Sequence, residues 1–263
     1  TTAICDPHEI ANVLGVPGIR YFLDAATEIP LDLRVMLSSC VPATSFETNG
    51  AGVLGAEDLA PLASHPRALG LAEVMNVPGV LSGDPLVLDK IEAFAGKPLD
   101  GHAPLVRGAA LSGYAAAGIS SCHESSELDE AQEKLTKGIA CWIREGSVAK
   151  DLHALAPLLT LATSTSVGFC TDDRNPLDIA HEGHLDHLIR GAIGLGVPAE
   201  VAYRAASWTV ARHYGLSQVG AIAPGYRADL VVLDDVARCS VGSVLAAGRL
   251  VSELDPRGAL RST

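Results

Sequence analysis

Short apolar segments alternate with segments of helical character along most of this chain. The apolar segments are too short for buried helices, and turn-forming or polar residues flank them. Such alternation is typical of a parallel sheet whose strands are joined by crossover helices. We expect strands at 1–5, 33–38, 68–74, 98–101, 119–122, 139–143 and 167–171. We expect helices at 18–27, 56–63, 85–95, 107–117, 127–137, 147–155, 183–194 and 198–213, with Ser147 as the N-cap of the helix at 147–155.

The seven strand–helix units predict an α/β fold, a (β/α)8 TIM-like barrel. A closed barrel of this type has eight strands. Because the first expected strand begins at residue 1, the simplest explanation is that strand one lies upstream of this sequence.

Composition and the change in sequence pattern near residue 216 predict two domains. Hydrophobic residues make up 48% of the chain and aromatic residues only 4%, so we expect a core of Ala, Leu, Val and Ile, as in sheets covered on both faces. Beyond residue 216, turn residues surround a β-branched segment at 220–234, and another apolar segment follows at 244–251 with no amphipathic helix between them. We therefore assign the barrel to 1–215 and part of a small β appendage to 216–263.

Four of the expected strands end in a lone residue of a metal-binding type. These residues are Glu73, His102, His123 and Asp172. Any one of them alone is interpreted more simply as a polar residue near a loop that has ordinary hydrogen-bond partners. Four at the same position in a repeated unit favour a shared site, because barrel enzymes gather their chemistry at the carboxyl ends of the strands. Oxygen and nitrogen donors of this kind suit a divalent ion.

Two adjacent carboxylates, Asp172 and Asp173, follow the last expected strand. Their repulsion requires a cation or another partner. Either could be a ligand, and we favour Asp172 as the first residue after the strand. Asp173 then pairs with Arg174 or caps the next helix, and it is also a candidate substrate contact.

Further polar residues are expected at the same rim. His8 and Glu9 follow the first strand and are candidate substrate contacts. The segment 181–187 carries three histidines but lacks the H-E-x-x-H spacing of zinc proteases. It is read instead as a polar helix start beside the site, or as a surface patch.

Charge and motifs exclude several classes of protein. The net charge of −12 argues against a nucleic-acid partner. The cysteines are scattered without C-x-x-C pairs, which is typical of reduced thiols in a cytoplasmic protein, and no apolar run is long enough to span a membrane. The sequence has no G-x-S-x-G elbow, no dinucleotide fingerprint and no H-x-E with P-C-x-x-C.

At these residues the chain resembles the adenine deaminase family of the amidohydrolase superfamily. The resemblance runs essentially from end to end. The matching motifs lie at 4–10, 39–43, 70–75, 100–104, 122–125, 143–147, 170–176, 182–186 and 221–233.

The resemblance implies a (β/α)8 barrel with a small β-sandwich, and the hydrolysis of adenine to hypoxanthine and ammonia in purine salvage. It also implies two divalent ions, manganese or iron, with zinc as an alternative. Glu73 would bridge the ions, His102 and His123 would hold the second, and Asp172 would hold the first and move protons. Glu124 or Glu9 would give a proton to the ring nitrogen next to the reacting carbon, and the sequence does not choose between them.

The chain departs from the family pattern at one point. The family carries a His-x-His pair at the end of strand one, and no H-x-H occurs in these 263 residues. Two alternatives therefore stay open: another amidohydrolase acting on cyclic amides or amino-sugar amides, and a polypeptide that is catalytically silent by itself. Open strand edges would favour association, and we expect a homo-oligomer.

Overall fold

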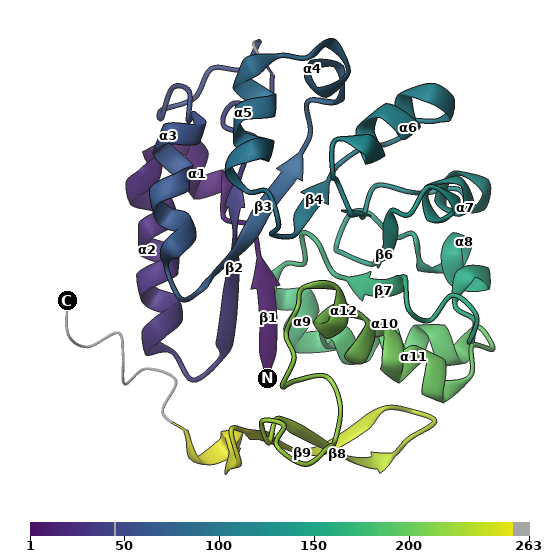
Figure 1. Ribbon diagram of the computed structural model, residues 1–263. Helices are drawn as coiled ribbons and strands as arrows, with labels where there is room; N and C mark the ends of the chain where they lie inside the picture. The colour runs from purple at the N-terminus through teal and green to yellow at the C-terminus, as the bar shows by residue number, and fades with distance from the viewer. Residues whose placement is uncertain (45, 255–263) are drawn as a thin grey trace. The chain divides into compact units, whose positions relative to one another are not determined.

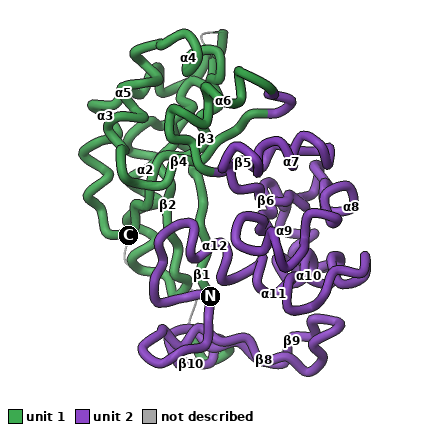
Figure 2. Tube along the Cα trace, turned by 45° about the vertical axis from the view of Figure 1, so that its right-hand side comes forward, with its two compact units in different colours: residues 1–103, 108–120, 252–263 green, residues 104–107, 121–251 purple. Residues whose placement is uncertain are grey.

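The computed structural model describes residues 1–44 and 46–254. The chain forms two compact units. The first unit contains residues 1–103, 108–120 and 252–263, and the second contains residues 104–107 and 121–251 (Figure 2). The predicted domain boundary near residue 215 stays a prediction, and its last residues, 255–263, lie outside the part described.

The first unit is built from parallel strands and their connecting helices (Figure 1). Strand β1 pairs with β2, β2 with β3 and β3 with β4, all in parallel, and α2 packs against β2. The elements are β1 (Thr2–Cys5), α1 (His8–Leu14), α2 (Val16–Glu28), β2 (Asp32–Ser38), α3 (Ala56–Leu59), a 3-10 helix (Ala60–Ser64), β3 (Ala68–Val74), α4 (Val77–Ser82), α5 (Pro85–Ala93), β4 (Leu99–Gly101) and α6 (Gly108–Ala116).

The second unit continues the same alternation and ends in a separate antiparallel sheet of three strands in the order β10-β9-β8. Strand β5 pairs with β6 and β6 with β7 in parallel. The elements are β5 (Ser121–Cys122), α7 (Leu128–Thr136), β6 (Ala140–Arg144), α8 (Leu152–Leu155), a 3-10 helix (Ala156–Leu158), β7 (Val167–Cys170), α9 (Pro176–Glu182), α10 (Leu185–Gly194), α11 (Ala199–Ala205), α12 (Trp208–His213), β8 (Leu230–Asp235), β9 (Ser240–Ala246) and β10 (Arg249–Leu250). A further 3-10 helix (Val251–Glu253) begins at the last residue of this unit, and its other two residues belong to the first unit.

Each unit has an aliphatic core, as the composition predicts. In the second unit, α10 and α11 pack against β7, and Leu188 and Val201 are buried with Val167. In the first unit, Ile19 of α2, Val35 of β2 and Leu71 of β3 are fully buried. Aliphatic residues of both the strands and the helices therefore form the inside of each unit.

The expected α/β fold class is confirmed, because parallel strands alternate with helices in both units, β1 to β4 in the first and β5 to β7 in the second. Several helix predictions are wrong. The helix expected at 147–155 covers only Leu152–Leu155, and Ser147 does not cap it, because the Ser147 hydroxyl donates to Asp178 Oδ2 at 2.6 Å. The helix expected at 198–213 is interrupted between α11 and α12, where the Ser207 hydroxyl donates to the Tyr203 carbonyl.

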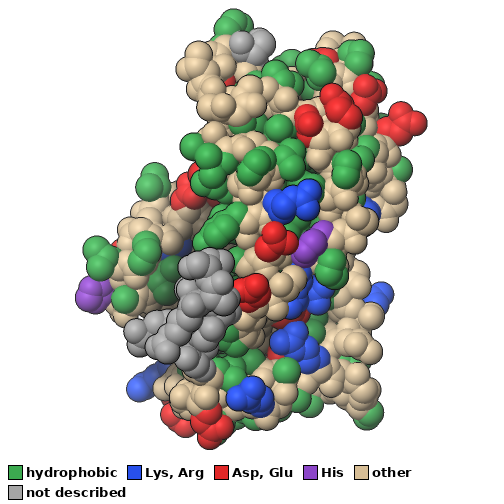
Figure 3. Space-filling model, turned by 90° about the vertical axis from the view of Figure 1, so that its left-hand side faces the viewer, with side chains coloured by type: hydrophobic (Ala, Val, Ile, Leu, Met, Phe, Trp, Pro, Cys, Tyr) green, Lys and Arg blue, Asp and Glu red, His purple; other side chains and the backbone are tan. Residues whose placement is uncertain are grey.

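The molecular surface carries both signs of charge. One face shows acidic and basic side chains with hydrophobic side chains between them (Figure 3). Within the residues described, no helix combines the length and the apolar character needed to cross a bilayer.

Candidate active site

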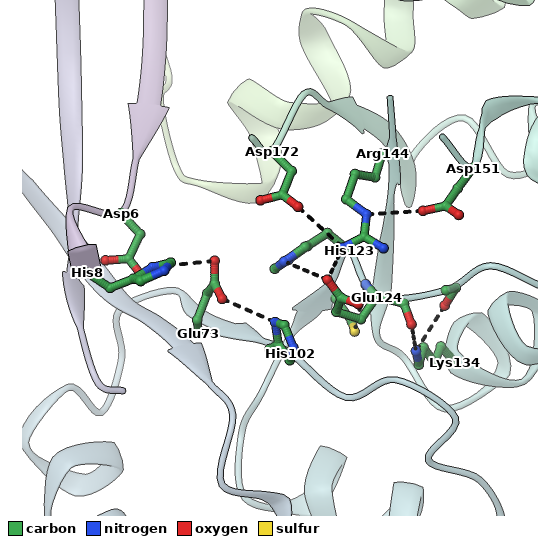
Figure 4. Close-up of polar contacts among 12 residues, drawn as sticks. Asp6, His8, Glu73, His102, His123, Glu124, Lys134, Arg144, Asp151 and Asp172 are labelled. Carbon is green, nitrogen blue, oxygen red and sulfur yellow. Dashed lines mark hydrogen bonds and ion pairs between the residues drawn. The ribbon is translucent and has the colours of Figure 1, made fainter. Parts of the chain in front are cut away.

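Glu73 lies near the end of strand β3 in an unusual backbone conformation. Its φ of 41° is in the left-handed region, which a non-glycine residue adopts only at some cost. The Ser39 hydroxyl donates a 2.8 Å hydrogen bond to the Glu73 carbonyl and so holds this backbone. Glu73 Oε2 lies 3.2 Å from His102 Nδ1, at the end of β4 (Figure 4). The ends of β3 and β4 therefore bring together two of the residues predicted from the sequence.

Tyr114 of helix α6 fixes the backbone beside both of these residues. Its hydroxyl donates to the Val74 carbonyl at 2.6 Å and accepts from the His102 backbone N–H at 3.0 Å. The Tyr114 side chain is fully buried. One hydroxyl thus ties the end of β3 to the end of β4.

A second group of polar residues follows β1 in the first unit. His8 Nδ1 lies 3.2 Å from Asp6 Oδ2, and His8 Nε2 lies 3.0 Å from Glu9 Oε1. Burial raises the pKa of Asp6 to about 6, and hydrogen bonds to Asp6 and Glu9 raise the pKa of His8 to about 11. Because His8 Nδ1 is also 4.0 Å from Glu73 Oε1, this group adjoins the pair formed by Glu73 and His102.

In the second unit, His123 and Glu124 follow β5. His123 Nε2 lies 3.5 Å from Glu124 Oε1. The preceding Cys122 is fully buried, in agreement with its interpretation as a small core residue. The buried Lys134 of α7 donates to the Glu124 carbonyl at 3.1 Å and to the Ser125 hydroxyl at 2.9 Å. These two hydrogen bonds hold the loop that follows β5 in place.

Arg144, the last residue of β6, is the centre of an ion-pair network. Its Nη1 pairs with Glu124 Oε1 and lies 3.3 Å from Asp172 Oδ2, and its Nε donates to Asp151 Oδ2 at 3.1 Å (Figure 4). The guanidinium group thus contacts three carboxylates from three different loops. Two of them, Glu124 and Asp172, are candidates for proton transfer according to the family resemblance.

The segment after Arg144 also supports the loop that carries Asp172. The Glu145 N–H donates to the Cys170 carbonyl at 3.2 Å, and the Ser147 N–H donates to the Asp173 carbonyl at 2.8 Å. Between them, Gly146 is so close to this loop that an added Cβ would lie 2.6 Å from the Thr171 carbonyl oxygen. These contacts hold Asp172, whose φ of 51° is in the left-handed region.

The structure corrects the prediction for the residues after Asp172. Helix α9 is capped by Asn175, whose side chain accepts from the backbone N–H groups of Leu177 and Asp178. The predicted cap by Asp173 is therefore wrong. Arg174 forms its ion pair with Glu182 at 2.6 Å.

The histidine-rich segment lies beside the same loop. His184 Nε2 is 3.2 Å from the Thr171 hydroxyl. Burial and the charge of Arg174 lower the pKa of His184. Of the two interpretations offered from the sequence, the contact with Thr171 favours a polar helix start beside Asp172.

Each unit offers a set of donors that suits a cation. In the second unit, ligand atoms of His123, Glu124 and Asp172 lie within 4.8 Å of one another. In the first unit, the close pair of Glu73 and His102 adjoins His8. Carboxylate and imidazole donors are the ones that manganese, iron and zinc bind in proteins.

Arg144 and Tyr114 are among the residues of the site that the sequence did not lead us to predict. Arg144 was visible as a charged residue at the end of an apolar strand, which is the same signal that identified the four candidate ligands. Tyr114 gave no such signal, because a tyrosine inside a helical segment is usually a core residue.

The fold and these strand ends define the class: a parallel α/β protein of TIM-like type with carboxylates and imidazoles at the carboxyl ends of its strands. The profile of the amidohydrolase family matches residues 1–251, and the chain belongs to that family.

Individual curated proteins are also highly similar to this chain in sequence. An adenine deaminase of Gluconobacter oxydans (strain 621H) is 62% identical over 253 residues, which cover 96% of this chain and 45% of the relative. An adenine deaminase of Methylobacterium nodulans is 60% identical over the same length and covers the same shares. The chain thus spans less than half the length of these curated relatives.

Solved structures support the fold. The crystal structure of an enamidase of the amidohydrolase superfamily matches with a TM-score of 0.65 at 14% identity, over 95% of this chain and 71% of that one. An N-acetyl-D-glucosamine-6-phosphate deacetylase from Mycobacterium smegmatis matches with a TM-score of 0.61 at 14% identity, over 95% and 74%.

Proposed function

We propose that the protein containing this chain hydrolyses adenine to hypoxanthine and ammonia. The observation that carries the proposal is the joint occurrence of curated adenine deaminases about 60% identical over 96% of the chain and strand-end donors suited to divalent ions. A purine base is then the small-molecule partner, and the cellular role is purine salvage.

The donor chemistry fits two divalent ions, which we propose to be manganese or iron, with zinc as an alternative. Glu73 has two oxygens and could bridge them, His102 and His123 would hold the second ion, and Asp172 would hold the first. Such ions act as Lewis acids that lower the pKa of a water molecule toward neutrality. Four hard oxygen and nitrogen donors, with no thiolate among them, agree with this choice.

The side chains supply the proton transfers of the reaction. The water oxygen forms a bond to C6 of the purine, and the bond from C6 to the amino group breaks. Asp172 takes the proton from the water and gives it to the departing nitrogen, because ammonia leaves more readily than the amide anion. This acid–base step is worth about 10²–10⁴-fold in rate.

The ring nitrogen beside C6 must also gain a proton. The second proton of the attacking water must leave the oxygen at C6, and Glu124 or Glu9 would take it from that oxygen and pass it to the ring nitrogen. In the second unit, Arg144 pairs with both Glu124 and Asp172, so these two carboxylates lie close together. We therefore favour Glu124, and we propose His8, Glu9 and Asp173 as contacts to the rest of the purine.

The test uses the full-length protein, loaded with manganese or iron and followed by the ultraviolet absorbance of adenine. We expect turnover in the wild-type protein and a large loss in Asp172→Asn at unchanged metal content. Unchanged turnover in Asp172→Asn would reject the role of Asp172. Turnover of a cyclic amide or an amino-sugar amide, with none of adenine, would instead favour the alternative amidohydrolase activity.

We also make proposals about the assembly of the protein and its location in the cell. Within the residues described, β1 pairs with β2 and β7 pairs with β6, and strands with an open edge favour association. We propose a homo-oligomer, which light scattering after gel filtration would measure. We also propose a cytoplasmic enzyme, because all six cysteines are free thiols.

A further inference from the structure

The network around Arg144 extends beyond the predicted site residues. We propose that Arg144 is a positioning residue: its guanidinium group fixes Glu124 and Asp172 in the orientations that proton transfer requires. The inference rests on the proposed function for the identity of the reaction, and it concerns only residues of the second unit.

The first argument is the geometry of the contacts. Arg144 Nη1 contacts both Glu124 Oε1 and Asp172 Oδ2, so one nitrogen sets the direction of one oxygen on each carboxylate. A guanidinium group is planar and rigid, so it holds such partners with little freedom. A lysine ammonium could supply the charge at this place, but it has no second nitrogen in a rigid plane that could also bind Asp151.

The second argument is how Arg144 itself is held. Its Nε donates to Asp151 Oδ2, and its own carbonyl accepts from the Asp151 backbone N–H at 2.9 Å. The loop between them is folded back by a bridge between Glu145 and Lys150 and by the Gly146 N–H donating to the Ala149 carbonyl. Asp151 thus anchors the side of the guanidinium group that faces away from Glu124 and Asp172.

The third argument is electrostatic. Glu124, Asp172 and Asp151 bring three carboxylates to one cation. Without the guanidinium group, Glu124 and Asp172 would repel each other and turn apart.

The test compares Arg144→Lys and Arg144→Ala in the metal-loaded, full-length protein. We expect kcat to fall about 10-fold to 100-fold in Arg144→Lys, as for a small misplacement of catalytic groups. KM and metal content should stay close to wild type. In Arg144→Ala, kcat should fall further than in Arg144→Lys. Part of that kcat should return when free guanidinium is added at concentrations far below those that unfold proteins. Arg107→Lys is the matched control, because Arg107 pairs with the exposed Asp129 on the surface.

A crystal structure of metal-free Arg144→Ala gives a readout that does not depend on activity. We expect the Glu124 and Asp172 side chains to be turned or disordered, whereas the wild type should keep both. Wild-type kcat in Arg144→Ala, a loss explained entirely by lost metal, or unchanged side chains in the crystal would overturn the proposal. If the wild type acts on a cyclic amide or an amino-sugar amide and not on adenine, the proposed function fails, and the same variants test Arg144 on that amide.

Discussion

The Tyr114 hydroxyl donates a 2.6 Å hydrogen bond to the Val74 carbonyl and accepts one from the His102 N–H. Both partners are backbone groups beside predicted metal ligands. We expect Tyr114→Phe to destabilise the protein by about 1–3 kcal/mol, because it removes two hydrogen bonds to backbone groups, one of them buried. Urea unfolding measures this change. Since the ends of β3 and β4 would also loosen, metal affinity should fall. Full stability with wild-type metal affinity would contradict this role.

Gly146 is required by the close approach of the loop that carries Asp172. In Gly146→Ala, the new Cβ would lie 2.6 Å from the Thr171 carbonyl and 2.8 Å from the Asp173 carbonyl. We expect a loss of stability of about 1–3 kcal/mol, typical of overpacking, together with a lower kcat. Thermal unfolding and turnover measure the two effects.

The matched control for this variant is Gly194→Ala. Gly194 is the last residue of α10 and has open space around it. A gain of helix propensity of up to about 1 kcal/mol is the expected result there. Equal effects of the two substitutions would show that the contact at Gly146 does not matter.

The ion pair between Lys134 and Glu130 lies in the interior, with side chains 0% and 1% exposed. Lys134→Met leaves Glu130 buried without its cation, which should cost about 3–5 kcal/mol in urea unfolding. Lys137→Met breaks a partly exposed pair with Glu133 at 3.5 Å and should cost no more than about 1 kcal/mol. Similar costs for both variants would argue against the anchoring role of Lys134 under the Glu124 loop.

The buried His213 should make the stability of the protein depend on pH. Burial lowers its pKa to about 4 in the folded protein, from the ordinary value of 6.5, and its ring packs edge-on against Trp142 at 4.9 Å. The unfolded chain therefore binds more protons between these pH values, so this contribution to stability is complete above pH 6.5 and is lost as pH falls toward 4.

Replacing His213 by phenylalanine removes the titrating group and should reduce the loss of stability on acidification. Urea unfolding at neutral pH and near pH 5 measures the difference for both proteins. An identical loss in wild type and His213→Phe would show that other groups account for the acid sensitivity.

The strands were more predictable than the helices. Most of the parallel strands are marked by a short apolar run, and β1, β2, β3, β4, β6 and β7 lie within one residue of their expected bounds. Helices α4 and α9 were missed although both begin with an Asn N-cap and an early proline. Both helices are short, with six and seven residues. A segment of that length is too short to show a clear helical periodicity of apolar residues.

The candidate ligands could be predicted because parallel strands present their carboxyl ends at one edge of a sheet. The supporting contacts could not. That Tyr114 reaches the ends of two strands, and that Arg144 meets carboxylates from three loops, depends on loop conformations that no sequence spacing encodes. The left-handed backbone at Glu73 and Asp172 was equally hidden, because neither residue is a glycine.

The most direct test of the account is a crystal structure of the full-length protein loaded with manganese, with the ions located by anomalous scattering. The account predicts two ions, with Glu73, His102, His123 and Asp172 among their ligands at about 2.0–2.2 Å. Ions bound elsewhere, or any of these four side chains turned away from an occupied site, would contradict it.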